Sequence, residues 1–156
     1  MSTTPSSLFA ALVGAELRAW NSLEEALADA GNPLSLGRFL VLRTVRDTDY
    51  CRIQEVASSQ GITLGAASRL VDRLSRDGLL HRTPCEHDRR ATILTVTRLG
   101  LSSLDTAETI VDAEQERLFT PLSHEQRDHF ARALALVAEA GDASRTGDTA
   151  PAKGRA

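Results

Sequence analysis

Residues 63–100 read TLGAASRLVDRLSRDGLLHRTPCEHDRRATILTVTRLG, and this stretch decides the fold. Thr63 at its start has a hydroxyl group that can accept a hydrogen bond from the free N–H groups of a helix. Apolar residues then recur with the spacing of one buried helical face, at Ala67, Leu70, Val71 and Leu74. Asp77-Gly78 ends the pattern, since glycine adopts the left-handed conformation at low steric cost. The stretch therefore opens with a helix that begins after Thr63.

Two short strands are predicted after this helix. The first covers 79–83 and the second 91–97. Apolar and hydroxyl side chains alternate in the second strand, with Ile93, Thr95 and Thr97 on one side and Leu94 and Val96 on the other. A charged tip, Cys85 to Arg90, separates the two strands. A helix, a hairpin and a basic tip in that order are typical of a winged helix.

The predicted helix also has a face opposite its apolar side. Its members are Leu64, Gly65, Ala66, Ser68, Arg69, Asp72 and Arg73. Small residues in the first turn let the backbone approach a partner, and the helix dipole favours an anion there. Ser68 and Arg69 can donate to phosphates or to base edges in a major groove about 12 Å wide, which admits one helix. The alternative is an ordinary solvated surface, and the helix alone does not decide between the two.

The hairpin tip favours DNA as the partner. Arg89 and Arg90 suit a narrow, electronegative minor groove. Asp88 can hold one of the two guanidinium groups by a charge-assisted hydrogen bond. The predicted helix and the predicted tip thus offer one element to each groove of a duplex.

The sequence DRRATILTVTRLG, residues 88–100, resembles the wing signature of MarR-family transcription regulators. That signature is an Asp, any residue, an Arg, three residues, then Leu-x-apolar-Thr and a nearby Gly. The preceding SRLVDRLSRDGLLHR, residues 68–82, resembles the family's recognition helix and first wing strand. By this resemblance Ser68 and Arg69 face the major groove, and Arg90, with Arg89 beside it, faces the minor groove. The expected DNA-binding set is Thr63, Gly65, Ala66, Ser68, Arg69, Arg73, Asp88, Arg89 and Arg90.

The composition fits a single domain with helical extensions and a sizeable core, because the chain has 156 residues. It contains no apolar run of about 18 residues, so we expect no membrane span. The first residues, MSTTPSS, carry no basic charge, which argues against a secretory signal. Two cysteines without a CxxC spacing fit a reducing compartment. We therefore expect a cytoplasmic protein, and the use of arginine over lysine suggests a bacterium with a GC-rich genome.

The net charge of −3 is unevenly distributed along the chain. Residues 34–100 hold 11 arginines and 7 acidic residues, so this segment carries +4 and the remainder carries −7. Affinity for phosphate depends on local basic residues and on the counterions they release. The sign of the segment's charge is therefore the one that a nucleic-acid partner requires, although its size is modest.

Turn and composition signals divide the chain further. We expect an N-terminal dimerisation helix within 1–33, a winged helix-turn-helix lobe over 34–100, C-terminal dimerisation helices over 101–140 and a disordered tail over 141–156. The expected helices cover 8–30, 35–46, 53–60, 63–77, 101–119 and 124–140. Ser35 is expected to cap the second helix, and Ser123 with Gln126 to form a capping box for the last. The fold class is thus mainly α with a small β-hairpin wing.

The first helix and the last two are long, amphipathic and outside the winged-helix lobe. Either they fold back on their own lobe, or they pack against a second copy of the chain. A module with one recognition helix gains affinity and specificity by presenting two helices to half-sites about one turn apart. In the MarR family the terminal helices form the dimer interface. We therefore expect a homodimer.

No motif of a known catalytic site is present, so we expect neither an enzyme nor a cofactor. His81, Cys85, Glu86, His87 and Asp88 could bind zinc, but a strand scatters such side chains to opposite faces, and we expect no metal site. Cys51 and Cys85 have arginines nearby that could stabilise a thiolate for redox sensing. The alternative is two inert thiols.

Trp20 and Arg18 are candidates for binding a small effector. In the MarR family small-molecule pockets lie between the dimerisation helices and the DNA-binding lobe. An indole and a guanidinium could take up an aromatic or phenolic acid by stacking and charge pairing. The alternative places Trp20 in the dimer core and leaves Arg18 in solvent.

These features together predict a sequence-specific regulator of transcription. We expect a repressor that binds an inverted-repeat operator in double-stranded DNA. Two alternatives stay open from the sequence. One is a winged-helix dimer that binds another protein through its hairpin, and the other is a thiol- or metal-sensing regulator that uses Cys85 and His87. Salt dependence separates DNA from protein as the partner, because counterion release makes DNA affinity fall steeply with salt.

Overall fold

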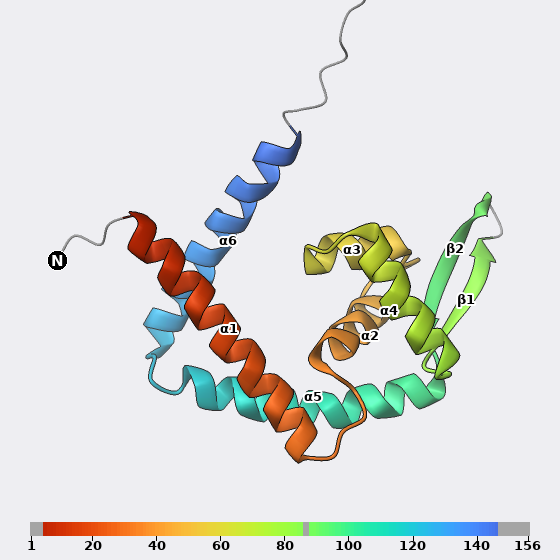
Figure 1. Cartoon of the computed structure of the whole chain (residues 1–156), viewed down its shortest axis with the longest axis horizontal. Coiled ribbons are helices and arrows are strands. Elements are labelled where there is room, and N and C mark those ends of the chain that lie inside the picture. The colour runs from red at the N-terminus through yellow and green to blue at the C-terminus, as the bar shows by residue number, and fades with distance from the viewer. Residues whose placement is uncertain (1–4, 86–87, 147–156) are drawn as a thin grey trace, which may run out of the picture. The chain divides into compact units, whose positions relative to one another are not determined.

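A computed structural model describes residues 5–85 and 88–146, with side chains described for 7–85 and 92–141. The described residues form six helices and two strands in the order α1-α2-α3-α4-β1-β2-α5-α6 (Figure 1). This confirms the predicted class, mainly α with a small antiparallel hairpin. Contacts divide the chain into two compact units, 1–116 and 117–156, and each is described separately.

Three short helices form the centre of the first unit. They are α2 (Leu36–Asp47), α3 (Ile53–Gln60) and α4 (Leu64–Arg76). The Oγ atom of Ser35 accepts a hydrogen bond from the Arg38 N–H at 3.4 Å, as expected for the N-cap of α2. Gly61 ends α3 with φ +60°, a conformation that glycine adopts without a Cβ clash.

The two ends of α4 are also set by local chemistry. Thr63 is its N-cap, and its Oγ1 atom accepts a hydrogen bond from the Ala66 N–H at 3.2 Å. Gly78 follows the C-terminal end of α4 with φ +72°. Between these ends, Ala67, Val71 and Leu74 are buried. The predicted apolar face is therefore the face that packs against the core, with Leu70 half-buried at its edge.

The hairpin is longer than the sequence predicted. Strand β1 (Leu80–Cys85) pairs with β2 (Asp88–Val96) in an antiparallel register that runs from Leu80 opposite Val96 to Pro84 opposite Thr92, and the register then shifts so that Cys85 lies opposite Asp88. The tip expected over 85–90 is wrong in its extent, because the backbone of Cys85 and of 88–90 belongs to the strands. The regular ladder therefore ends at Pro84 and Thr92, and an irregularity separates it from the last pair before the turn.

Helix α5 (Arg98–Phe119) begins three residues earlier than predicted. Thr97, expected in the second strand, is its N-cap. The Thr97 Oγ1 atom accepts a hydrogen bond from the Gly100 N–H at 3.0 Å and donates one to the Gly78 carbonyl at 2.7 Å. One hydroxyl group thus joins the end of the wing, the turn after α4 and the start of α5.

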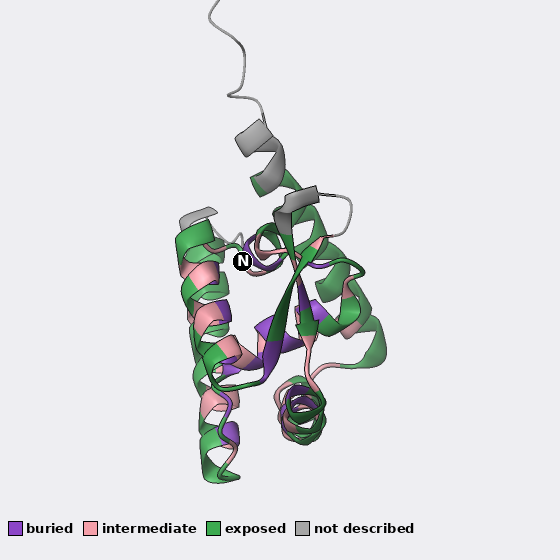
Figure 2. Cartoon of the chain, turned by 90° about the vertical axis from the view of Figure 1, so that its right-hand side faces the viewer, coloured by how far each residue is buried: buried purple, intermediate pink, exposed green. Residues whose placement is uncertain are grey.

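Helix α1 (Pro5–Asp29) contributes only its last turns to the core of this unit. Leu27 is buried and Leu23 packs against the core, whereas Phe9 is 70% exposed near the other end of the helix. The core itself comprises buried residues of all five helices and both strands, among them Phe39, Val56, Val71, Leu80, Leu94 and Leu104. In Figure 2 the hairpin is buried at its base and exposed towards its tip.

The second unit contains the end of α5 and helix α6 (His124–Thr146). The predicted capping box is present: the Ser123 N–H donates to Gln126 Oε1 at 2.8 Å, and the Gln126 N–H donates to Ser123 Oγ at 3.3 Å. Helix α6 runs beyond the predicted end, so residues 141–146, expected to be disordered, are helical. Residues 147–156 of the expected tail lie outside the described residues.

The described helices include no candidate membrane span. None of them combines the length and the apolar character needed to cross a bilayer.

Candidate nucleic-acid interface

The N-terminal turn of α4 contains two residues with small side chains, Gly65 and Ala66. Gly65 is exposed, and a Cβ atom built there would meet nothing within 4 Å. Ala66 is half-buried, and its N–H is bound by Thr63, which leaves the other N–H groups of the turn to a partner. The turn therefore lets another molecule come close to its backbone, and the helix dipole favours an anion at that point.

Arginines continue along the exposed side of the same helix. Arg69 and Arg73 are both exposed and stand one turn apart, while Ser68 is half-buried beside them. Arg76 is exposed as well and lies three residues beyond Arg73. Residues three and four apart share a helical face, so Arg76 extends the predicted set. Arg76 could have been predicted from the sequence, because it continues the helical spacing of Arg69 and Arg73.

Asp72 belongs to this face but is not free to repel DNA phosphate. Its Oδ1 atom accepts a hydrogen bond from Arg82 Nη2 on β1 at 2.5 Å, in a pair whose side chains are 46% and 35% exposed. The pair neutralises the one carboxylate on the helix face and connects α4 to the wing. Arg82 was not among the residues predicted from the sequence, because strand position alone does not reveal its partner.

The wing residues are placed only in part. The backbone of Asp88, Arg89 and Arg90 lies in β2, directly after the turn. Their side chains lie outside the described residues, as do Glu86 and His87 entirely. The predicted minor-groove contacts therefore remain predictions.

The structure does not bring the expected effector residues together within one chain. Arg18 and Trp20 both lie on α1, and positions two apart on a helix do not face each other. The guanidinium group of Arg18 lies back over Gly14, with Nη1 3.3 Å from the position a Cβ atom would take there. Trp20 is 38% exposed on the apolar side. Arg18 and Trp20 could contact the same ligand only if another structural element completed the site.

The two cysteines differ in accessibility. Cys51 is fully buried, and burial, with a smaller contribution from the charge of Glu55, raises the pKa of its thiol to about 11. Cys85 is partly exposed at the end of β1. Because the thiolate is the reactive form, Cys51 is an inert structural thiol. No group of three metal-ligating residues occurs among the side chains that the structure describes, which leave out three of the five candidates, Glu86, His87 and Asp88.

A helix-turn-helix, an arginine-bearing second helix and an antiparallel wing lie within residues 34–100, and a family model matches the same region. The MarR family model covers residues 34–92. Residues 34–92 are thus similar to the MarR family. The match begins just before α2 and ends within β2, so the family's similarity covers the part of the chain that holds the candidate interface.

Known regulators of transcription resemble the chain beyond this region. The HTH-type transcriptional regulator BilQ of Clostridium symbiosum is 24% identical over 110 residues, which is 70% of this chain and 76% of BilQ. The transcriptional repressor CouR, solved bound to a 23-mer DNA duplex, is 28% identical with a TM-score of 0.76, and the match covers 86% of this chain and 92% of CouR. Both are described as regulators of transcription and neither as an enzyme, in agreement with the non-catalytic reading of the sequence.

A third protein shares the fold. BpsR of Bordetella bronchiseptica, whose DNA binding is regulated by 6-hydroxynicotinic acid, is 21% identical with a TM-score of 0.76. The match covers 83% of this chain and 91% of BpsR. At this identity the similarity establishes the winged helix-turn-helix fold and no more.

Proposed function

We propose that the chain is a sequence-specific regulator of transcription that binds an inverted-repeat operator as a homodimer and represses the genes beside it. In this proposal α4 of each protomer enters a major groove, and the β1–β2 wing reaches the flanking minor groove. Such a regulator works in the cytoplasm, where its operator is.

The observation that carries the proposal is the exposed face of α4. This face carries three exposed arginines, Arg69, Arg73 and Arg76. The carboxylate beside them, that of Asp72, is paired with Arg82. An unhindered helix N-terminus precedes them. The relative CouR, which has the same fold, was solved on a DNA duplex. A helix with these properties suits phosphate contacts at its start and base or phosphate contacts along its length.

Dimerisation is supported by apolar surface that a single chain leaves in water. Helix α1 exposes one apolar side, and its members are Leu8, Phe9, Leu12, Val13, Leu17 and Trp20. Helix α6 exposes Phe130, Leu134, Leu136 and Val137. Contiguous apolar patches of this kind mark interfaces between proteins. A second copy is the natural partner because an inverted repeat requires two-fold symmetry.

Repression that a small ligand relieves is the regulatory part of the proposal. CouR is described as a repressor, and the DNA binding of BpsR responds to a small aromatic acid. A ligand acts on DNA affinity only if it binds the DNA-competent and the incompetent conformations unequally.

Fluorescence anisotropy on a duplex selected from a random pool tests the DNA interface. Arg69→Ala is expected to weaken binding by about tenfold or more and to relax sequence preference, as loss of a base contact of about 1–3 kcal/mol implies. Arg73→Ala and Arg76→Ala should weaken binding to all sequences alike and lower the salt slope by about one each. Arg132→Ala, which removes an exposed arginine of α6, is the matched control and should change nothing.

Two results would contradict the proposal. One is DNA affinity that does not depend on salt, since counterion release is unavoidable when arginines neutralise phosphates. The other is equal binding by wild type and the three α4 variants. With the protein folded and dimeric, either result would favour a protein partner for the same face.

A further inference from the structure

An exposed leucine stands at the N-terminal end of α4. Leu64, the first residue of this helix, is 53% exposed, whereas the other apolar side chains of α4 are buried or half-buried. The Cα–Cβ bonds of a helix tilt towards its N-terminal end, so the side chain of the first residue points ahead of the helix. Leu64 therefore lies at the end of the helix that contacts base edges when a recognition helix enters a major groove.

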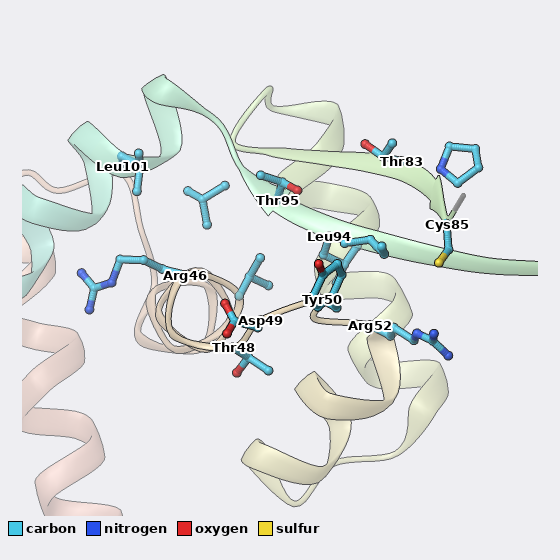
Figure 3. Close-up of a pocket in the computed structure, with 14 residues that line it drawn as sticks. Arg46, Thr48, Asp49, Tyr50, Arg52, Thr83, Cys85, Leu94, Thr95 and Leu101 are labelled. Carbon is cyan, nitrogen blue, oxygen red and sulfur yellow. The ribbon is translucent and has the colours of Figure 1, made fainter. Parts of the chain in front are cut away.

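An open groove of about 900 Å³ lies beside the wing and takes no part in this surface (Figure 3). The end of α2 and segment 48–52, with the exposed Tyr50, form one wall, and the two strands form the other. The Leu94 N–H donates to the Cys51 carbonyl at 2.8 Å, which holds this segment against β2. No residue of α4 is among those that line the groove. Helix α4 therefore does not receive a partner into this groove, and it contacts one through side chains that protrude, such as that of Leu64.

The first turn of α4 has no side chain that reads a base by hydrogen bonding. Leu64, Gly65 and Ala66 have no polar group in their side chains. The Thr63 Oγ1 atom accepts a hydrogen bond from the Ala66 N–H at 3.2 Å, so the cap holds this hydroxyl group against the helix end. A base pair opposite the first turn therefore meets the apolar side chain of Leu64. In the major groove the apolar group that a base pair offers is the 5-methyl group of thymine.

We infer that Leu64 selects a thymine in each half-site by packing on its 5-methyl group; this specificity rests on the proposed function. The other bases present hydrogen-bonding groups without a methyl group, and a leucine packed on those groups leaves them unpaired. Arg69 lies five residues further along α4. At a rise of about 1.5 Å per residue and about 3.4 Å per base pair, the two residues are about two base pairs apart. The thymine is therefore within about two base pairs of the base that Arg69 contacts, for which guanine fits a guanidinium group best.

Deoxyuridine tests the contact directly, because it differs from thymidine only in lacking the 5-methyl group. Fluorescence anisotropy would measure the affinity of wild type for its selected duplex with deoxyuridine in place of each thymine of one half-site in turn. At one of these positions the affinity should fall about fourfold, as burial of one methyl group implies. Unchanged affinity at every thymine would overturn the inference.

The variant Leu64→Ala assigns the methyl contact to Leu64. Alanine favours the helix and the leucine is exposed, so the variant should fold, which circular dichroism checks. It should bind the thymidine and deoxyuridine duplexes with equal affinity. Leu99→Ala is the matched control, because Leu99 is a 58% exposed leucine near the start of α5, and this variant should keep the fourfold difference. A fourfold difference that persists in Leu64→Ala would overturn the inference, since another group would then contact the methyl.

Selection from a random DNA pool separates this inference from the proposed function. Leu64→Ala protein should enrich an inverted repeat that has lost its preference for thymine at one position of each half-site and has kept the base opposite Arg69. An inverted repeat enriched by wild type without a thymine within about two base pairs of that base would overturn the inference and leave the proposed function standing. Wild-type protein that is folded and binds no duplex would refute both.

Discussion

At the scale of single residues, Gly100 sets the junction between the wing and α5. A Cβ atom at this position would lie 2.2 Å from the Leu79 carbonyl oxygen and 2.7 Å from Cγ1 of Val96. Both neighbours belong to the base of the wing, and one of them is backbone that cannot move aside. The glycine near the end of the wing signature therefore has a steric cause, which the sequence does not reveal because Leu79 is 21 residues away.

Gly100→Ala is expected to destabilise the fold by about 1–3 kcal/mol, the usual cost of forcing an extra carbon into a packed site. Chemical denaturation at a fixed protein concentration measures the change. Gly37→Ala is the matched control, because Gly37 is also helical and has nothing within 4 Å of its Cβ position. That control should be neutral or stabilising by up to about 1 kcal/mol. Equal stability of the two variants would show that the contact with Leu79 is not tight.

The two thiols make a second prediction at this scale. With the pKa of Cys51 raised to about 11 by burial, its thiolate fraction at neutral pH is on the order of one in ten thousand. Native protein should therefore present one reactive thiol to a disulfide reagent, and Cys85→Ser should present none until it is unfolded. Rapid reaction of Cys51 in folded Cys85→Ser protein would contradict the buried placement.

At the scale of elements, α2 is tied to α5 by one bidentate ion pair. Nη1 of Arg46 donates to Oε2 of Glu108 at 2.7 Å, and Nη2 donates to Oε1 at 2.9 Å. Hydrogen bonding to Arg46 lowers the pKa of Glu108 below its usual value. A carboxyl group that is more acidic in the folded state stabilises the fold above its unfolded pKa of about 4.3 and loses that contribution as the pH falls.

Glu108→Gln should thus cost about 0.5–1 kcal/mol at pH 7, a value that allows for solvent screening of a pair that is about one-third exposed. The difference from wild type should shrink as the pH falls from about 5 towards 3, where the wild-type carboxyl group takes up its proton. Denaturation at several pH values measures it, with Glu139→Gln on α6 as the control. A difference that does not change with pH would mean that the pair contributes by packing and not by charge.

Elements were predictable where their limits depend on close neighbours in sequence. Thr63 caps α4 and Ser123 caps α6 through atoms three residues away, so both starts could be read directly. The start of α5 was misjudged because Thr97 continues the alternation of the second strand. Its hydroxyl group is fixed instead by the Gly78 carbonyl, 19 residues earlier. A contact at that separation has no local signal.

At the scale of the whole molecule, the apolar sides of α1 and α6 require a partner. None of the side chains described in α6 is buried, although Phe130, Leu134 and Val137 recur with helical spacing on one side. Amphipathic helices are stabilised mainly by packing, so a helix of this length needs its apolar side covered. A second copy of the chain covers it in the proposed dimer.

Val137→Lys tests this interface without disturbing the protomer, because Val137 is 58% exposed in the single chain. We expect the dimer dissociation constant to rise about tenfold or more, since a buried Val contributes about 1.5–3 kcal/mol. Sedimentation equilibrium measures the constant. Glu139→Lys, an exposed polar position on the same helix, is the control and should have a much smaller effect. An unchanged constant in Val137→Lys would exclude this side of α6 from the interface.

The residues of the candidate site that lie on α4 could be predicted from the sequence, whereas the contacts between separate segments could not. Ser68, Arg69 and Arg73 follow from periodicity, and Arg76 follows from the same spacing once α4 is seen to reach it. The Asp72–Arg82 pair and the groove at Tyr50 were not predictable, since both join segments that are separate in sequence. Tyrosine also gives no sign in a sequence that its backbone adopts a positive φ.

Selection of bound duplexes from a random DNA pool, at low and at moderate salt, tests the central claim most directly. A homodimer that reads DNA through α4 predicts enrichment of an inverted repeat whose half-sites are about one helical turn apart, with weaker retention at the higher salt. Arg69→Ala protein should select a repeat that is less defined in its half-sites. Folded, dimeric protein that enriches no sequence at either salt would contradict the account.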